Sequence, residues 1–311
     1  MSFTADVKNE LTRVPPTCSH CERAVLAALL RVEGTLFFSG HGRYRIEMAM
    51  DMPKVARLAI QLLHTEYHLR TELTMRQSVL HKTPNYLITV PQQPGLESAL
   101  VDLGIAGNAG LELGVASHLV EKRCCQAAYL RGVFMGSGFI ANPKGDFHFE
   151  MSVESEQLAT DIAQMMQARG INARVMKRRN AHLVYLKSGT SISEFLALVG
   201  AHQCALALEN ARVIKSVRND VNRQVNADMA NQAKAADAAM GQVEAIRKIL
   251  QHKNPADITP ALRDFMRLRL ENPSASLKEL GELADPPLSK SAVYHRVRRI
   301  EQMAEELNRA Q

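Results

Sequence analysis

The sequence predicts an α+β fold, in which a pseudo-twofold duplicated αββαββα domain is followed by a small all-α helix-turn-helix domain. The first observation behind this prediction is an apolar stretch rich in small residues that recurs about a hundred residues later, with the same order of helix and strand patterns after each copy. The second is that residues 245–311 carry only helical patterns. A chance alignment of two βα units is the alternative explanation for the repeat.

The repeated stretches are Leu26–Gly34 and Leu130–Gly138, each long enough for about two helical turns and each ending on glycine, a common helix terminator. Small residues such as Ala28 and Gly132 would let two such helices pack backbone against backbone. A glycine inside a helix costs about 1 kcal/mol relative to alanine, so close packing is the expected reason for Gly132. Both stretches resemble the nine-residue pattern of the LAGLIDADG homing endonucleases, and this resemblance implies two halves of one LAGLIDADG-like domain.

Matching elements are predicted after each stretch: a β-hairpin, an amphipathic helix, two more strands and a short closing helix. In the first half we expect hairpin strands at 35–38 and 44–48, a helix at 54–64, strands at 69–75 and 86–90, and a helix at 95–103. In the second half we expect hairpin strands at 139–142 and 147–151, a helix at 156–169, strands at 173–177 and 182–186, and a helix at 193–199.

These elements give a domain plan. We expect an N-terminal helix within 1–22, the duplicated domain at 23–208 with halves at about 23–105 and 124–205, a linker at 209–244 and a helix-turn-helix domain at 245–311. The linker residues favour helix but carry too little apolar surface for a core of their own. A helical or partly mobile linker is therefore expected.

Composition limits the class of protein. Hydrophobic residues make up 46% of the chain, which is ample for packed cores, and no apolar run approaches the length of a membrane span. The first residues lack a signal-peptide core, so we expect a cytoplasmic protein with no membrane partner. The net charge of +6 is compatible with nucleic-acid binding but does not demonstrate it.

The cysteine pattern argues against a disulfide framework, because five is an odd number and the chain has no export signal. Cys18 and Cys21 have the spacing of half a zinc site, and the adjacent Cys124 and Cys125 could complete it. A second well-spaced pair is missing, however. We therefore expect unpaired thiols at the start of the two repeated helices, and no metal or other cofactor.

The C-terminal region predicts a helix-turn-helix with a supporting helix before it. Thr259-Pro260 is a cap and first helical position for the supporting helix, which ends at Asn272-Pro273. Ser276-Leu-Lys-Glu279 is a capping box that begins a short helix, and Asp285-Pro-Pro-Leu288 is a tight connector. Ser289 then caps the final helix, so the motif is expected at about 276–307.

The outward face of the final helix carries the strongest functional signal. Val293, Val297 and Ile300 are expected to face inward, with polar and basic residues opposite. From Ser289 to Ile300 there are four Lys or Arg residues and no acid, which suits a major groove where arginine reads guanine. A solvated helical face is the alternative. The candidate DNA-binding residues are Lys278, Ser289, Lys290, Ser291, Tyr294, His295, Arg296, Arg298, Arg299 and Gln302.

A degenerate LAGLIDADG pair followed by this helix-turn-helix resembles the WhiA family of bacterial regulators, above all in Ser276–Arg298 and in the linker run Val221-Asn-Arg-Gln-Val-Asn226. The resemblance implies a sequence-specific transcription regulator that binds double-stranded DNA in the nucleoid. It also implies roles in cell division, chromosome segregation and, in some lineages, sporulation. A scaffold whose N-terminal domain recruits RNA polymerase or another regulator is a compatible interpretation.

Nuclease activity is the alternative that the LAGLIDADG resemblance raises. In those enzymes the acid before the final glycine of each signature helix binds the catalytic metal, and the matching residues here are Glu33 and Ser137. A serine hydroxyl does not neutralise Mg²⁺ as a carboxylate does, so we expect no cleavage. Because an acid at a helix C-terminus is disfavoured by the helix dipole, we expect Glu33 to have a local partner such as an arginine.

A second DNA surface is implied by the same resemblance, because the two sheets of those nucleases form a saddle that grips DNA. The matching strand regions carry Arg70 and Arg76 in the first half, diluted by Glu66 and Glu72. The possible secondary DNA contacts in the second half are Arg174, Lys177, Arg178 and Arg179. Solvated rim residues are the alternative, so we expect weak binding without sequence preference from this domain.

Overall fold

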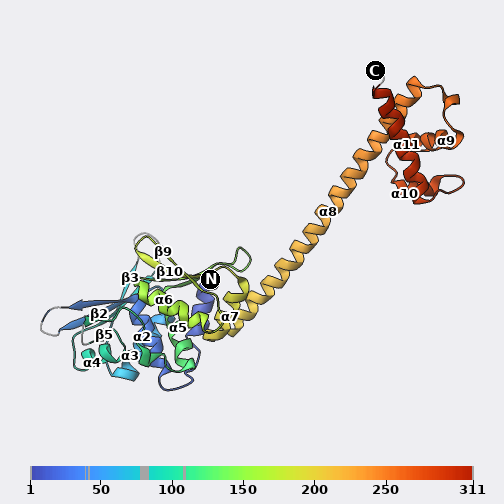
Figure 1. The fold of residues 1–311 in the computed structure, drawn as a ribbon. Helices are drawn as coiled ribbons and strands as arrows, with labels where there is room; N and C mark the ends of the chain where they lie inside the picture. The colour runs from blue at the N-terminus through green and yellow to red at the C-terminus, as the bar shows by residue number, and fades with distance from the viewer. Residues whose placement is uncertain (1, 39, 41–42, 78–83, 108–109, 310–311) are drawn as a thin grey trace. The chain divides into compact units, whose positions relative to one another are not determined.

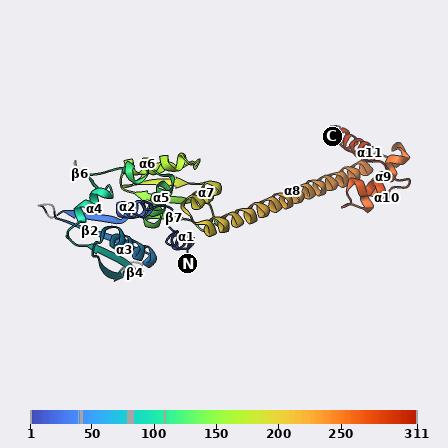
Figure 2. The ribbon, with the colours of Figure 1, turned by 90° about the horizontal axis from the view of Figure 1, so that it is seen from below.

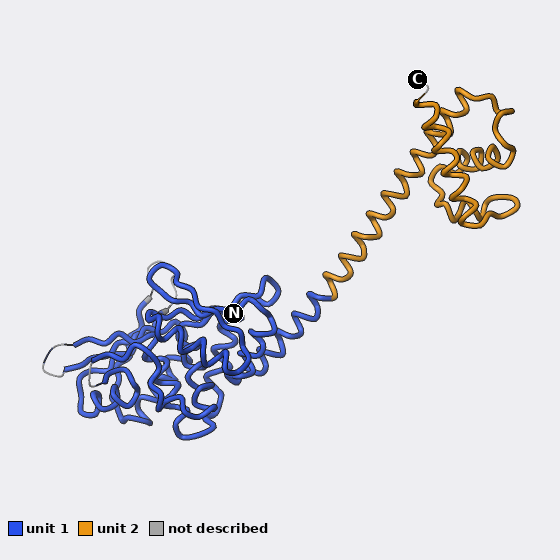
Figure 3. The backbone as a smooth tube through the Cα atoms, viewed as in Figure 1, with its two compact units in different colours: residues 1–216 blue, residues 217–311 orange. Residues whose placement is uncertain are grey.

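The computed structural model describes residues 2–38, 40, 43–77, 84–107 and 110–309 (Figure 1). The chain divides into two compact units, Met1–Ser216 and Val217–Gln311 (Figure 3). No helix in the described part of the chain combines the length and the apolar character that crossing a membrane would need.

The first unit contains the αββαββα order twice, after an N-terminal helix α1 (Phe3–Leu11). The first copy consists of α2 (Cys21–Glu33), β1 (Gly34–Phe38), β2 (Tyr44–Met50), α3 (Pro53–Tyr67), β3 (Glu72–Gln77), β4 (Pro84–Val90) and α4 (Leu96–Asp102). The second consists of α5 (Arg123–Ser137), β7 (Gly138–Ile140), β8 (Phe149–Val153), α6 (Glu156–Gln167), β9 (Arg174–Arg178), β10 (Ala181–Leu186) and α7 (Gly189–Val199). The predicted duplication and fold class are confirmed.

Both copies fold into antiparallel sheets of the same topology, with strand orders β1-β2-β4-β3 and β7-β8-β10-β9. The buried pairs Met48–Ile88 and Met151–Val184 occupy equivalent central positions in the two sheets. Helix α3 packs on the first sheet and α6 on the second, while α2 and α5 lie side by side between the copies (Figure 2). Each sheet therefore buries one face against helices and turns its other face outward.

The connection between the copies is irregular. It contains a short strand pair, β5 (Ala106–Gly107) with β6 (Gly110–Leu111), and one 3₁₀ turn, η1 (Ser117–Leu119). Gly110 has φ of 121°, a conformation that side-chain-bearing residues rarely adopt.

The contact between α2 and α5 explains Gly132. A Cβ atom at this position would lie 2.6 Å from the carbonyl oxygen of Val25 and 2.7 Å from the Cβ of Ala28. Both distances are below van der Waals contact, and one obstacle is backbone that cannot move without shifting α2. The expected reason for Gly132, close packing of two helices, is confirmed.

The glycines that end α2 and α5 do not act as left-handed caps. Gly34 and Gly138 have φ of −86° and −78° with extended ψ, so each helix passes directly into a strand. A Cβ at Gly34 would overlap the carbonyl oxygen of Leu30, and one at Gly138 would lie 2.5 Å from that of Phe134. These glycines are required by the close approach of the chain to the preceding helical turn rather than by a positive φ.

The expected linker lies inside one helix, α8 (His202–His252), which has 51 residues. Its first turns belong to the first core, through Cys204, Ala205 and Leu208, and its last turns belong to the second core, through Ile246 and Ile249. Between them the side chains are almost all exposed, as the polar, alanine-rich composition predicts. The anticipated boundaries at 209 and 244 coincide with no break in the helix.

The second unit adds η2 (Pro255–Asp257), α9 (Pro260–Glu271), α10 (Leu277–Leu283) and α11 (Lys290–Arg309) to the end of α8. The predicted capping box between Ser276 and Glu279 is present in both directions. Phe265, Leu280 and Val297 lie in the core of this unit. Around that core, α9, α10 and α11 match the predicted helix-turn-helix with its supporting helix.

Replacing Gly132 by alanine tests the helix pair. The new Cβ gains about 1 kcal/mol of helix propensity but overpacks against α2, which typically costs about 1–3 kcal/mol. We therefore expect a lower unfolding temperature for the first unit in calorimetry of the full chain. Gly241→Ala is the matched control, because a Cβ at Gly241 in α8 meets nothing within 4 Å. That variant should be as stable as the wild type or more stable, and an equal gain in Gly132→Ala would contradict the packing argument.

Candidate DNA-binding surface and degenerate metal site

The start of α11 is fixed by local contacts. The Oγ of Ser289 accepts a hydrogen bond from the backbone N–H of Ala292 at 3.3 Å, as predicted for a cap. Helix α10 crosses close by at Gly281, where a Cβ would lie 2.8 Å from the carbonyl oxygen of Leu288. Val293, Val297 and Ile300 are buried, so the predicted inward face of α11 is confirmed.

The opposite face of α11 is exposed. Its exposed residues include Ser291, Tyr294, His295, Arg298, Arg299 and Gln302, and the side chains of Ser289 and Lys290 at its start are exposed as well. In the described part of the chain, Lys290, Arg298 and Arg299 make no ion pair with an acid. A basic helix face without internal partners is free to contact phosphates and base edges.

Two of the predicted DNA-binding residues, Arg296 and Lys278, lie outside the exposed face of α11 described above. Arg296 is half-buried and borders a cleft that is also lined by Asp264 of α9 and Asp285 of the connector. It therefore lies to one side of the exposed face that carries Arg298. Lys278, on α10, is exposed and lies 3.8 Å from Glu282, a surface ion pair that contributes little and exchanges readily.

The positions of the degenerate metal site adjoin one another at the ends of α2 and α5. A Cβ at Gly136 would lie 3.6 Å from Oε1 of Glu33, which places this carboxylate beside the last turn of α5. Ser137, the matching residue of the second copy, donates its hydroxyl to the carbonyl oxygen of Val133 at 3.3 Å. The geometry of the two helix ends is retained, but only one of them offers a carboxylate.

Lys8 of α1 lies at this same place and was missed by the sequence analysis. Its Nζ donates to the carbonyl oxygen of Gly136 at 2.8 Å and lies 3.8 Å from Asp51, although the residue is only 4% exposed. Burial lowers the pKa of Lys8, and the negative charges of Asp51 and Glu33 oppose that shift. The signal was available, because Lys8 falls on the apolar stripe of Val7 and Leu11 in α1.

The pKa of the Glu33 carboxyl is changed by the same surroundings. Burial raises its pKa to about 7, the nearby Lys8 opposes the rise, and the charge of Asp51 adds to it. The expected local partner of Glu33 is therefore a lysine rather than an arginine. A divalent cation here would meet a fixed ammonium group and a serine in place of a second carboxylate, so these residues do not suit the two-metal chemistry of the endonucleases.

The outward face of the first sheet is electrically balanced. Alternation from the buried Met48 places Arg45 and Glu47 on the outward face of β2, while Glu72 and Arg76 lie on the outward face of β3. Arg45 is 3.1 Å from Glu47 and its guanidinium lies over the ring of Phe37. Arg70 lies outside the strands, just before β3. Among the described residues of β2 and β3, this face therefore offers no net positive charge to a phosphate backbone.

The four basic residues proposed as secondary contacts in the second sheet do not share one surface. Arg174 and Arg178 alternate onto the same face of β9, whereas Lys177 points to the other side, opposite His182. Arg179 lies beyond the strand with a φ of 56°. Arg174 and Arg178 are therefore the pair that could follow phosphates together, and Glu150 of β8 lies on the same face.

Comparison with known proteins covers nearly the whole chain. The models of the WhiA N-terminal LAGLIDADG-like domain, the WhiA LAGLIDADG-like domain and the WhiA C-terminal HTH domain match residues 19–106, 126–218 and 221–304. The probable cell division protein WhiA of Desulforamulus reducens is 40% identical over 310 residues, covering 99% of this chain and 96% of that protein. The protein of the same name from Symbiobacterium thermophilum is 41% identical over 309 residues, covering 99% and 98%.

The fold agrees with solved structures as well. The crystal structure of full-length WhiA from Thermatoga maritima matches with a TM-score of 0.60 and 24% identity, covering 98% of this chain and 99% of that one. A crystal structure of an N-terminal LAGLIDADG domain of WhiA matches with a TM-score of 0.51 and 21% identity, covering 64% of this chain and 90% of that one.

The pKa of Glu33 predicts a pH dependence of stability. Its ordinary pKa is 4.5 and its value in the folded chain is about 7, so the folded state binds this proton more tightly than the unfolded state. The stabilisation is full below pH 4.5 and is lost as the pH rises through 7. Glu33→Gln, which stays neutral, should therefore be more stable than the wild type at pH 8.5, by about 3 kcal/mol at most, and by less than about 1 kcal/mol at pH 5.

Urea unfolding of the first unit at both pH values measures this effect. Glu194→Gln, which makes the same substitution at an exposed residue of α7, is the control, and its stability is compared with that of the wild type at the same two pH values. A Glu33→Gln variant that is less stable than the wild type at pH 8.5 would contradict the assignment of a raised pKa.

The degenerate site also predicts the outcome of a cleavage assay. Full-length protein incubated with Mg²⁺ or Mn²⁺ should leave supercoiled plasmid and target DNA uncut. A metal pair needs a carboxylate from each helix end, whereas Ser137 offers none and Lys8 places an amino group at the site. Gel electrophoresis of the plasmid detects single nicks. Metal-dependent nicking that disappears in Glu33→Ala would show that the site is active after all.

Proposed function

The chain belongs to the WhiA family, and on this premise we propose that it is a sequence-specific, DNA-binding transcription regulator without nuclease activity. The observation that carries the proposal is the exposed basic face of α11, which has no acidic partner in the described part of the chain. Two relatives are named probable cell division proteins, so we propose that the regulated genes act in cell division. Chromosome segregation and, in some lineages, sporulation are part of the same proposal.

The proposed DNA contacts divide by their position on α11. His295 and Arg298 lie near the centre of the exposed face, where side chains of a recognition helix reach base edges. Ser291 and Gln302 extend that row toward the two ends of the helix, and Tyr294 lies beside it. These residues would supply sequence discrimination.

Phosphate contacts are proposed for the margins of the motif. Lys290 lies in the first turn of α11 and Arg299 lies beside the central row, and both are exposed. Ser289 presents a hydroxyl at the N-terminus of α11, where backbone N–H groups and the helix dipole favour an anion. Lys278 occupies the corresponding first turn of α10. These contacts would fix the position of the helix without reading sequence.

The double-sheet unit is proposed to contribute a protein contact rather than strong DNA binding. On its first outward face the described charged residues of β2 and β3 balance, and Phe37, which is 37% exposed, lies on that face beside Arg45. Mixed charges with exposed aromatic rings are typical of protein-binding surfaces. RNA polymerase or another regulator is the proposed class of partner, with the complex bound to DNA in the nucleoid.

Substitutions on α11 test the division of contacts. Arg298→Ala or His295→Ala should reduce the preference for the native target over unrelated DNA by about 1–3 kcal/mol per lost base contact. Lys290→Ala should weaken binding to both DNAs equally. It should also reduce the slope of log affinity against log salt concentration by the amount expected for about one lost phosphate contact. Fluorescence anisotropy on targets identified by sequencing crosslinked chromosomal DNA measures both quantities. If Arg298→Ala kept full affinity and preference, the proposed register of the recognition helix would be wrong.

A further inference from the structure

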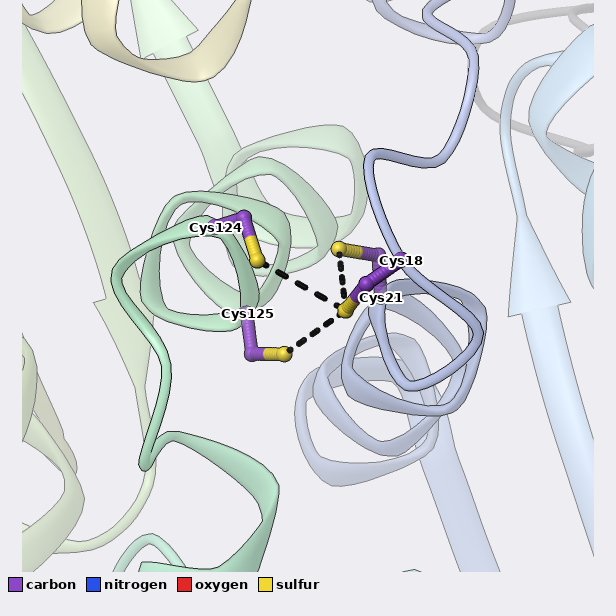
Figure 4. Close-up of side chains that lie close together, drawn as sticks. All are labelled: Cys18, Cys21, Cys124 and Cys125. Carbon is purple, nitrogen blue, oxygen red and sulfur yellow. Dashed lines mark hydrogen bonds between the residues drawn. The ribbon is translucent and has the colours of Figure 1, made fainter.

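Four of the five cysteines come together at the N-terminal ends of α2 and α5, with their side chains turned toward one another (Figure 4). Cys18 lies just before α2 and Cys21 is its first residue, while Cys124 and Cys125 lie in the first turn of α5. The Sγ of Cys18 is 3.5 Å from that of Cys21 and 3.6 Å from those of Cys124 and Cys125. All four sulfur atoms lie within 4.8 Å of one another.

We propose that these four cysteines bind one Zn²⁺ ion as a tetrahedral tetrathiolate site that joins the two copies of the duplicated domain. Four ligands at the usual Zn–S distance of 2.3 Å place their sulfur atoms about 3.8 Å apart. The three separations from the Sγ of Cys18 are already within a few tenths of an ångström of that value, and the upper limit of 4.8 Å exceeds it by only about an ångström. Rotation of side chains is enough to close this difference.

The sequence alone favoured unpaired thiols because Cys124 and Cys125 lack the spacing of a second zinc-binding pair. The fold removes that objection. The two adjacent residues project from the first helical turn of α5 toward a Cys-x-x-Cys turn that belongs to a different helix. In that turn the backbone N–H of Cys21 donates to the carbonyl oxygen of Cys18, which brings both of its sulfur atoms to one side.

The burial of the cluster suits a structural metal. Cys21 and Cys125 are each 2% exposed, so they form the inner side of the cluster, whereas Cys18 and Cys124 are half-buried. A metal ion could therefore enter from the outer side and be held against the core. The positive ends of the dipoles of α2 and α5 also favour negative charge on the sulfur atoms.

A buried cation supplies a second, independent argument. Four thiolates with Zn²⁺ carry a net charge of −2. Arg131 of α5 is only 8% exposed and lines the same small cavity as Cys21, and its Nε donates to the carbonyl oxygen of Val199 at 2.8 Å. Within the described residues no carboxylate pairs with its guanidinium. A tetrathiolate centre provides the negative charge that a buried arginine otherwise lacks.

The consequence of this site is structural. The metal would fasten the segment between α1 and α2 to the start of α5, so that the two central helices are joined at their N-terminal ends. Because all four ligands come from the protein, the site is closed and leaves no position for a substrate. Metal binding would then add directly to the folding free energy of the first unit.

The test uses full-length protein purified under reducing conditions from cells grown with zinc. Elemental analysis should find about one zinc per chain. Exchange for Co²⁺ should produce thiolate-to-metal charge-transfer bands and the intense visible bands of tetrahedral cobalt. Cys18→Ser and Cys125→Ser should lose the metal and the spectrum. Cys204→Ser is the matched control, because this fifth cysteine is also buried but lies outside the cluster, and it should retain both.

Several outcomes would overturn the proposal. Metal-free protein in which all five cysteines titrate as thiols would do so, as would a disulfide between Cys18 and Cys21 in freshly purified protein. Iron bound by the same cysteines in zinc-grown cells would overturn the assignment of the metal. Because the zinc content and cobalt spectrum of the unaltered protein need no variant, they decide the question even if a serine variant fails to fold.

Discussion

The packing of α2 against α5 is the constraint on which the first unit depends. The two helices approach so closely that Gly132 cannot carry a Cβ, and the same contact runs past Gly136, where a Cβ would press on Glu33. A single helix pair therefore fixes both ends of the unit at once. Its C-terminal ends hold the degenerate metal site, and its N-terminal ends hold the four-cysteine cluster. Any change in the crossing of the two helices would displace both groups of side chains.

The two ends of this helix pair have opposite chemistry, and each follows from the helix dipoles. At the C-terminal ends, exposed carbonyl groups favour a cation, and Lys8 supplies one by donating to Gly136. At the N-terminal ends the positive ends of the helix dipoles favour anions, and the proposed metal site would hold the cysteines there as thiolates. A metal pair at the C-terminal ends would have to displace an ammonium that is already hydrogen-bonded. The loss of one carboxylate at Ser137 and the gain of Lys8 therefore argue in the same direction against cleavage.

The parts of the structure that the sequence predicted are those determined by local patterns. The repeat, both hairpins, the capping box at Ser276 and the buried stripe of α11 are readable because each depends on residues a few positions apart. The features that were missed, such as Lys8, or considered and rejected, such as the four-cysteine site, depend on contacts between distant segments. Lys8 lies on α1 but acts at the end of α5, and Cys18 meets Cys124 only through the fold. Rules based on sequence spacing describe ligands that come from one continuous segment, so they do not detect such pairs.

The DNA-binding helix α11 and the helix pair α2 and α5 belong to two different hydrophobic cores, so substitutions in one are expected to leave the stability of the other unchanged. Arg298 belongs to a unit whose buried residues, including Phe265 and Val297, form a cluster distinct from that around α2 and α5. Substitutions more than about 7–10 Å apart with no shared partner usually add in their effects on stability. A change at Arg298 should therefore leave the unfolding of the first unit unaltered, while a change at Gly132 should leave α11 folded. A loss of DNA discrimination in an α11 variant can then be assigned to the contacts of that helix, because the double-sheet unit keeps its own core and its own stability.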